Sequence, residues 1–80
     1  MSQKTLDAVF ADPVRANIHW DKIESLIKWL GGDVTKGGGS SVAFHLNGIR
    51  AIFHSPHPQK EASRGLIKRL RGFLEDAGVH

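Results

Sequence analysis

Residues 41–58, which read S-V-A-F-H-L-N-G-I-R-A-I-F-H-S-P-H-P, decide the fold of this 80-residue chain. Apolar residues alternate with other types on both sides of the dipeptide Asn47-Gly48. Asn-Gly between two such runs is the strongest short-range signal for a two-residue hairpin, because both turn residues need a positive φ. We therefore predict that residues 41–46 and 49–54 form paired antiparallel strands.

A two-residue turn also fixes which residues of the two strands face each other. Leu46 pairs with Ile49, and the pairing continues outward until Ser41 meets His54. Directly opposed residues point to the same side of a sheet, and the sides alternate along each strand. One side then carries only apolar residues and should be buried: Val42, Phe44, Leu46, Ile49, Ala51 and Phe53. The side turned away from the core carries Ser41, Ala43, His45, Arg50, Ile52 and His54.

Composition limits the class of protein. The formal net charge of +3 permits a polyanionic partner but does not require one. The absence of Cys excludes disulfides and Cys-based metal sites, and it fits a reducing compartment. No apolar run approaches the roughly 20 residues that span a bilayer, and the N-terminal residues lack the apolar segment of a secretory signal. We therefore expect a cytoplasmic protein that makes no membrane contact.

Helical periodicity appears on both sides of the hairpin. It predicts a short helix over about residues 3–12, a second helix over about residues 20–30, and a last helix that starts between residues 60 and 65 and ends at Gly78. Residues 33–36 predict a weak edge strand. The expected order is α-α-β-β-β-α, an α+β fold in which the helices pack on one face of a three-stranded antiparallel sheet.

Four basic residues recur near helical spacing around the last helix, opposite its apolar face: Lys60, Arg64, Lys68 and Arg71. One interpretation is contact with the phosphates of RNA or DNA, to which Arg50 on the open sheet face would contribute. The other is the solvated outer face that any amphipathic helix has. The pattern alone leaves both open.

Three histidines stand out among the five. The predicted register places His45 and His54 on one face with Arg50, and His57 follows on the segment that leaves the same sheet. An imidazole titrates at about pH 6.5, so it can take or give a proton at neutral pH. RNA cleavage through the 2′-hydroxyl needs a base, an acid and a cation for the phosphate, which two His and one Arg can supply. Zinc is the weaker alternative, because no carboxylate or Cys joins the three His; we expect neither a metal nor another cofactor.

The chain resembles the HicA-type toxins, the small ribonucleases of bacterial and archaeal toxin–antitoxin pairs. The likeness lies in the second helix ending in Leu30-Gly31, in Gly39-Ser40 before the hairpin, in Pro56-His57-Pro58-Gln59-Lys60-Glu61, and in Leu74-Glu75-Asp76-Ala77-Gly78-Val79. It covers residues 20–79. We expect residues 1–80 to form one HicA-like domain in which residues 1–19 are an N-terminal helical extension.

The resemblance implies a double-stranded-RNA-binding-like fold, ribosome-independent cleavage of mRNA, and neutralisation by a HicB-type antitoxin encoded beside the toxin. Family members usually carry their catalytic His directly after the Gly-Ser pair, where this chain, as a divergent member, has Ser41. Three explanations stay open. His54, predicted to face Ser41, supplies the imidazole from the neighbouring strand; or the protein binds RNA or its antitoxin without cleaving; or Ser41 is an inactivating substitution. The first is our leading hypothesis.

Overall fold

The structure is a computed structural model, and it describes residues 2–79. The helices are α1 (Ser2–Val9), α2 (Trp20–Trp29) and α3 (Arg64–Asp76). The strands are β1 (Ile18–His19), β2 (Asp33–Lys36), β3 (Ser41–Leu46), β4 (Ile49–His54) and β5 (Glu61–Ala62). β2, β3 and β4 form a three-stranded antiparallel sheet in that order, which confirms the predicted α+β class. The short β1 and β5 pair separately, and sequence analysis missed them because two residues carry no alternation.

The hairpin has the predicted turn and register. Asn47 and Gly48 have φ values of 51° and 82°, and the pairing runs from Leu46 with Ile49 to Ser41 with His54. On the inner face, four of the six side chains are buried and two are partly buried, as follows: Val42, Phe44, Leu46 and Phe53, then Ile49 and Ala51. The turn chemistry and the burial pattern therefore specify the same register.

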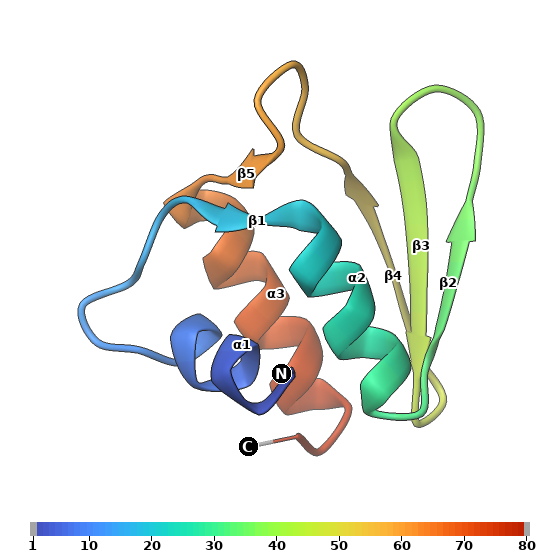
Figure 1. Ribbon diagram of the computed structural model, residues 1–80. Helices are drawn as coiled ribbons and strands as arrows, with labels where there is room; N and C mark the ends of the chain where they lie inside the picture. Colours follow the sequence, from blue (N-terminus) through green and yellow to red (C-terminus); the bar gives the residue numbers. More distant parts are fainter. Residues whose placement is uncertain (1, 80) are drawn as a thin grey trace.

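Phe44 lies at the centre of the core and is fully buried. Its ring centroid is 5.6 Å from that of Trp20, 5.2 Å from that of Phe53 and 6.1 Å from that of Phe73. These rings come from α2, β4 and α3, so the aromatic cluster ties both helices to the sheet. Figure 1 shows α2 and α3 side by side against one face of the β2–β3–β4 sheet, whose other face is open.

The N-terminal extension packs into the same core. Val9, near the end of α1, is fully buried among core side chains. The guanidinium group of Arg71 on α3 donates to the backbone carbonyls of Val9 and Ala11. Carbonyl groups at the end of a helix have no intrahelical partner, so Arg71 satisfies acceptors that would otherwise lack one. This contact fixes α1 on the surface of α3.

The β1–β5 pair joins the extension to the segment after β4. The backbone N–H of Asn17 donates to the carbonyl of Ala62 (3.0 Å), and that of Trp20 donates to the carbonyl of Lys60 (2.8 Å). Lys60 ends the loop formed by residues 55–60, and Ala62 belongs to β5, which follows that loop directly. The pair therefore anchors the loop that carries His57.

Gly32, in the turn between α2 and β2, lies close to the backbone of β3, and its substitution tests this contact. A Cβ atom at Gly32 would lie 2.5 Å from the backbone carbonyl oxygen of His45, and neither backbone can yield easily. We expect Gly32→Ala to lower the free energy of unfolding by about 1–3 kcal/mol, measured by urea denaturation. Gly72→Ala is the matched control, because it lies in α3 with open space around it; it should raise stability by about 0.5–1 kcal/mol. Equal effects of the two substitutions would contradict the close approach.

Arg71 and Lys68 provide a second matched pair. We expect Arg71→Met to lower the free energy of unfolding by about 1–3 kcal/mol, because the carbonyls of Val9 and Ala11 lose a charged donor. Lys68→Met on the exposed face of the same helix should change it by less than about 0.5 kcal/mol. Urea denaturation followed by circular dichroism measures both, and an Arg71→Met variant as stable as the unsubstituted chain would refute the anchoring role.

Candidate active site

The turn before β3 and the loop after β4 are held together at one end of the sheet. His54 faces Ser41 across the strand pair, and its Nδ1 atom lies 3.4 Å from the hydroxyl oxygen of Ser40. The backbone N–H of Ser55 donates to the carbonyl of Ser40 at 2.8 Å. The His54 side chain is exposed on the outer face, as predicted. The position after the Gly-Ser pair therefore has an imidazole beside it, supplied by the neighbouring strand.

A hollow of about 290 Å³ opens at the same end of the molecule. It lies between the first turn of α2, the end of β2, the turn before β3 and the loop of residues 55–60, and the loops concerned reach the same end in Figure 1. Its lining residues are Trp20, Asp21, Glu24, Lys36, Gly39, Ser41, Val42, Ser55, Pro56, His57 and Lys60. Ser41 and His57 thus border one space, although they are sixteen positions apart in sequence.

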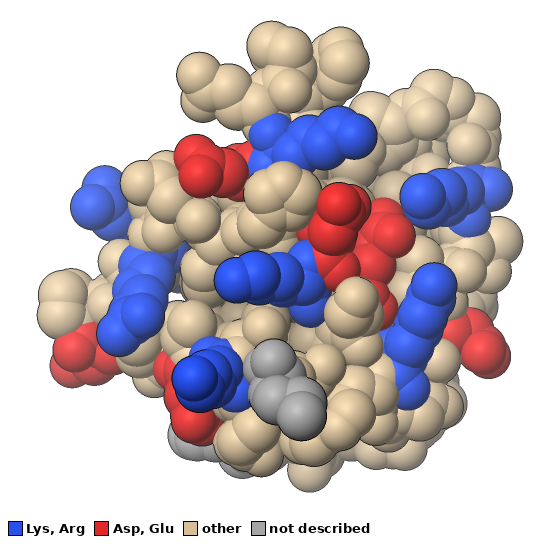
Figure 2. Space-filling view, viewed as in Figure 1, with Lys and Arg blue, Asp and Glu red and all other residues tan. Residues whose placement is uncertain are grey.

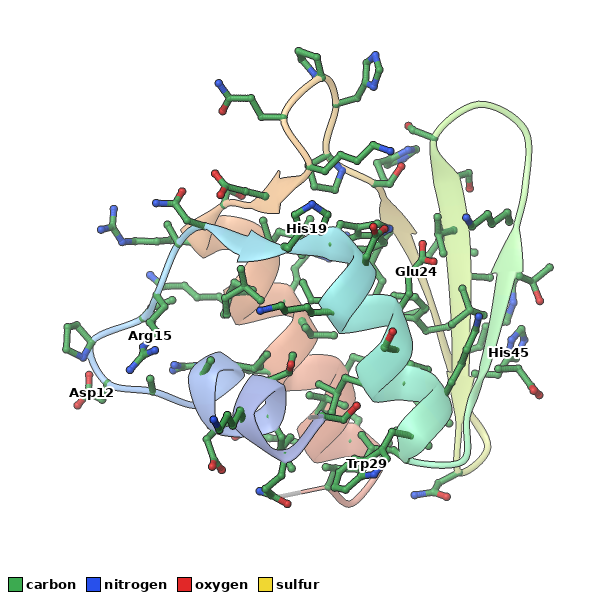
Figure 3. All side chains as sticks on the ribbon, viewed as in Figure 1. Asp12, Arg15, His19, Glu24, Trp29 and His45 are labelled. Atoms are coloured by element: carbon green, nitrogen blue, oxygen red, sulfur yellow. The ribbon has the colours of Figure 1, made fainter. Side chains whose placement is uncertain are left out.

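The expected convergence of three histidines is wrong for His45. It is exposed on the outer face, as predicted, but it pairs with Arg50 near the turn end of the hairpin. It lies four positions along β3 from Ser41, which corresponds to about 13 Å. Figure 3 shows His45 on the side of the sheet opposite Glu24. His45 and Arg50 therefore cannot act on the same phosphate as His54, and the cations near the site are Lys36 and Lys60.

The four basic residues predicted to form a stripe around the last helix do not share one surface. Lys60 precedes α3 and lines the hollow, while Arg64 and Lys68 are exposed on the helix. Arg71 is only partly accessible, because its guanidinium group contacts α1. Its assignment to RNA binding is therefore corrected to a structural role, which helical spacing could not reveal because the acceptors come from α1.

Glu24 and Lys36 line the hollow and were missed by sequence analysis. The Glu24 side chain is 12% exposed, and its Oε2 atom accepts a hydrogen bond from the indole N–H of Trp20 at 2.6 Å. Its Oε1 atom lies 3.8 Å from the Nζ atom of Lys36. The four-residue spacing of Trp20 and Glu24 on a helix was the available signal, since residues so spaced are neighbours. Nothing in the sequence indicated Lys36.

Basic and acidic side chains alternate over the face shown in Figure 2, rather than separating into patches of one sign. Within residues 2–79, no group of three or more His, Asp or Glu side chains lies close enough to hold a metal ion. No helix in this part of the chain has the length and apolar character needed to cross a bilayer. What the site offers is imidazole, hydroxyl, carboxylate and ammonium groups around a small hollow.

Comparison with known proteins gives one match. Residues 20–79 match the family model described as the HicA toxin of bacterial toxin–antitoxin, and residues 1–19 lie outside the match. No curated protein and no solved structure matches the chain. The matched segment contains α2, the whole β2–β3–β4 sheet, the hollow and α3. The chain therefore belongs to the HicA toxin family of bacterial toxin–antitoxin systems.

Proposed function

We propose that this protein is the toxin of a toxin–antitoxin pair and that it cleaves mRNA by attack of a ribose 2′-hydroxyl on the adjacent phosphate. Family membership supports the toxin role. The single observation that carries the chemistry is the position of His54, which faces Ser41 with its Nδ1 atom 3.4 Å from Ser40 Oγ. This places an imidazole beside the position at which the family usually has its catalytic His.

The reaction requires two proton transfers. A base takes the proton of the 2′-hydroxyl, whose oxygen bonds to phosphorus while the bond to the 5′-oxygen breaks. An acid protonates that 5′-oxygen, and the products are a 2′,3′-cyclic phosphate and a free 5′-hydroxyl. We assign the two transfers to His54, whose Nδ1 atom lies 3.4 Å from Ser40 Oγ, and to His57, which lines the hollow together with Ser41.

The contact between His54 and Ser40 favours Nε2 as the nitrogen that transfers the proton. Ser40 engages Nδ1, and this leaves Nε2 as the atom available to RNA. The hydroxyl of Ser40 thus orients the ring in the way that a second group orients the base in many hydrolytic sites. Lys60, which lines the hollow, supplies the positive charge for the phosphate in place of Arg50.

RNA beyond the cleaved bond also needs contacts. Arg64 and Lys68 are exposed on α3 and can bind phosphates without regard to sequence. We propose a HicB-type antitoxin as the protein partner, and the cytoplasm as the compartment where toxin and mRNA meet.

Ser41 favours a second candidate, which is a HicA-like module that binds RNA or its antitoxin without cleaving. A serine hydroxyl is a poor acid or base at neutral pH, so a protein that relied on this position alone would be inactive. In this candidate His54 and His57 are surface residues, and only the phosphate contacts are functional.

Substitution of the histidines tests the proposed chemistry. We expect His54→Ala and His57→Ala each to lower the rate of cleavage of a purified mRNA by about a hundredfold or more, because each removes a proton-transfer group. His45→Ala is the control: it removes an exposed imidazole from the same face, about 13 Å along the strand, and should leave the rate unchanged. Full activity of His54→Ala would remove His54 from the mechanism.

Ser41→His separates the two candidates. If the unsubstituted chain gives no cleavage products while Ser41→His cleaves RNA, the protein is a non-cleaving member whose site lacks only the family's imidazole. If the unsubstituted chain cleaves RNA and loses activity through His54→Ala, the imidazole acts from β4.

Growth assays test the toxin role independently of the residue assignments. Induced expression of the chain should arrest the growth of a bacterial host, and co-expression of a HicB-type protein encoded beside it should restore growth. The double substitution His54→Ala/His57→Ala should be harmless while still binding the antitoxin in a pull-down assay. Unimpaired growth with the unsubstituted chain at high expression would argue against a toxin.

A further inference from the structure

We propose that the hollow beside Ser41 and His57 binds a guanine base of the RNA, with Glu24 and Lys36 reading its Watson–Crick edge. In this arrangement the Glu24 carboxylate accepts from N1–H and from the N2 amino group, and the Lys36 ammonium group donates to O6. The inference deepens the proposed function, because it assumes that the ligand is RNA, and it names the nucleotide that the site selects.

The Glu24 carboxylate can accept more hydrogen bonds than the protein supplies. Its carboxylate is largely covered, and Oε2 accepts from the Trp20 indole at 2.6 Å. Oε1 has no hydrogen bond within the described part of the chain, since the Lys36 Nζ atom at 3.8 Å is beyond hydrogen-bond distance. A carboxylate that is largely shielded from water is stabilised by additional hydrogen-bond donors. Such donors can approach Glu24 from the hollow.

The ion pair between Glu24 and Lys36 is not a sufficient structural reason for placing these two residues together. The Lys36 side chain is 72% exposed, and a pair of this kind between an exposed ammonium group and a carboxylate adds little to stability. The Trp20 indole, in contrast, is buried against Phe44 and holds the Glu24 side chain in one position. The Glu24 carboxylate is therefore held in place, while the exposed Lys36 ammonium group can move to meet a ligand. Such a pair can bind an uncharged ligand that presents both donors and acceptors, such as the edge of a nucleobase.

Guanine matches the pair better than the other bases do. Its Watson–Crick edge presents two adjacent donors, N1–H and the N2 amino group, followed by the acceptor O6. Adenine, cytosine and uracil each offer one donor group with an acceptor next to it, so the second carboxylate oxygen would meet a lone pair. Oε1 and Nζ lie 3.8 Å apart, so the two groups stand side by side and can each face one of two neighbouring atoms of a base edge.

The position of the hollow fits a nucleotide at the cleavage site. Its volume of about 290 Å³ suits one nucleoside rather than a larger ligand. Ser41, His57 and Lys60 also line it, so the phosphate of the bound guanosine would lie beside His57 and Lys60 and near Ser41, the residue that His54 faces in the strand pair. The mixture of charges on this face in Figure 2 also favours recognition of a base together with phosphate over binding to phosphates alone.

Binding of RNA that cannot be cleaved tests the inference separately from catalysis. The probes are fluorescent pentanucleotides with 2′-O-methyl riboses that differ only in the central base, titrated with the full chain and followed by fluorescence anisotropy. We expect the probe with central guanine to bind about tenfold more tightly than those with adenine, cytosine or uracil. Glu24→Gln should reduce this preference to less than about twofold, because the amide offers one acceptor instead of two.

Glu75→Gln is the matched control, because it removes the same charge from an exposed site on α3 and should preserve the preference. A Glu24→Gln variant with unchanged circular dichroism that still prefers guanine would overturn the inference, as would equal binding of the four probes by the unsubstituted chain. Cleavage without base preference would sink the inference and leave the proposed function standing. A guanine preference without cleavage would support the inference and contradict the nuclease.

Discussion

The register of the β3–β4 hairpin is the constraint on which the rest of the structure depends. Asn47 and Gly48 adopt positive φ values, which a two-residue turn requires and which few other residue pairs tolerate. A shift of one residue would turn Phe44 and Phe53 toward solvent and remove the surface on which α2 and α3 pack. The same shift would separate His54 from Ser41, so the core and the candidate site are fixed by one turn.

Cross-strand pairing also relates this chain to its family. Residues that face each other in an antiparallel pair point to the same side, so a functional group can occupy almost the same space from either strand. Ser41 and His54 have this relation, and Ser40 contacts the imidazole. The proposed nuclease therefore needs an imidazole at one place on the sheet surface, and either of the two paired strands can supply it.

The segment before residue 20 contributes to the site through the backbone. β1 pairs with β5, and the carbonyls of Lys60 and Ala62 accept hydrogen bonds from the segment that enters α2. Arg71 holds the end of α1 against α3. The β1–β5 pairing joins residues 18 and 19, which lie outside the family match, to the strand that directly follows the loop carrying His57. A short chain with a small core gains rigidity from such contacts near its functional loop.

The hairpin, its buried face and the order of the main helices and strands could be predicted from the sequence, because turn chemistry and apolar periodicity act between residues a few positions apart. The same register places His45 and His54 on the outward face and separates them by four positions along the sheet. The contact of Arg71 with α1, and the meeting of Glu24 and Lys36 beside Ser41, became visible in the folded structure alone. Those contacts join elements far apart in the chain, and their geometry is set by how the helices pack on the sheet, which no local pattern encodes.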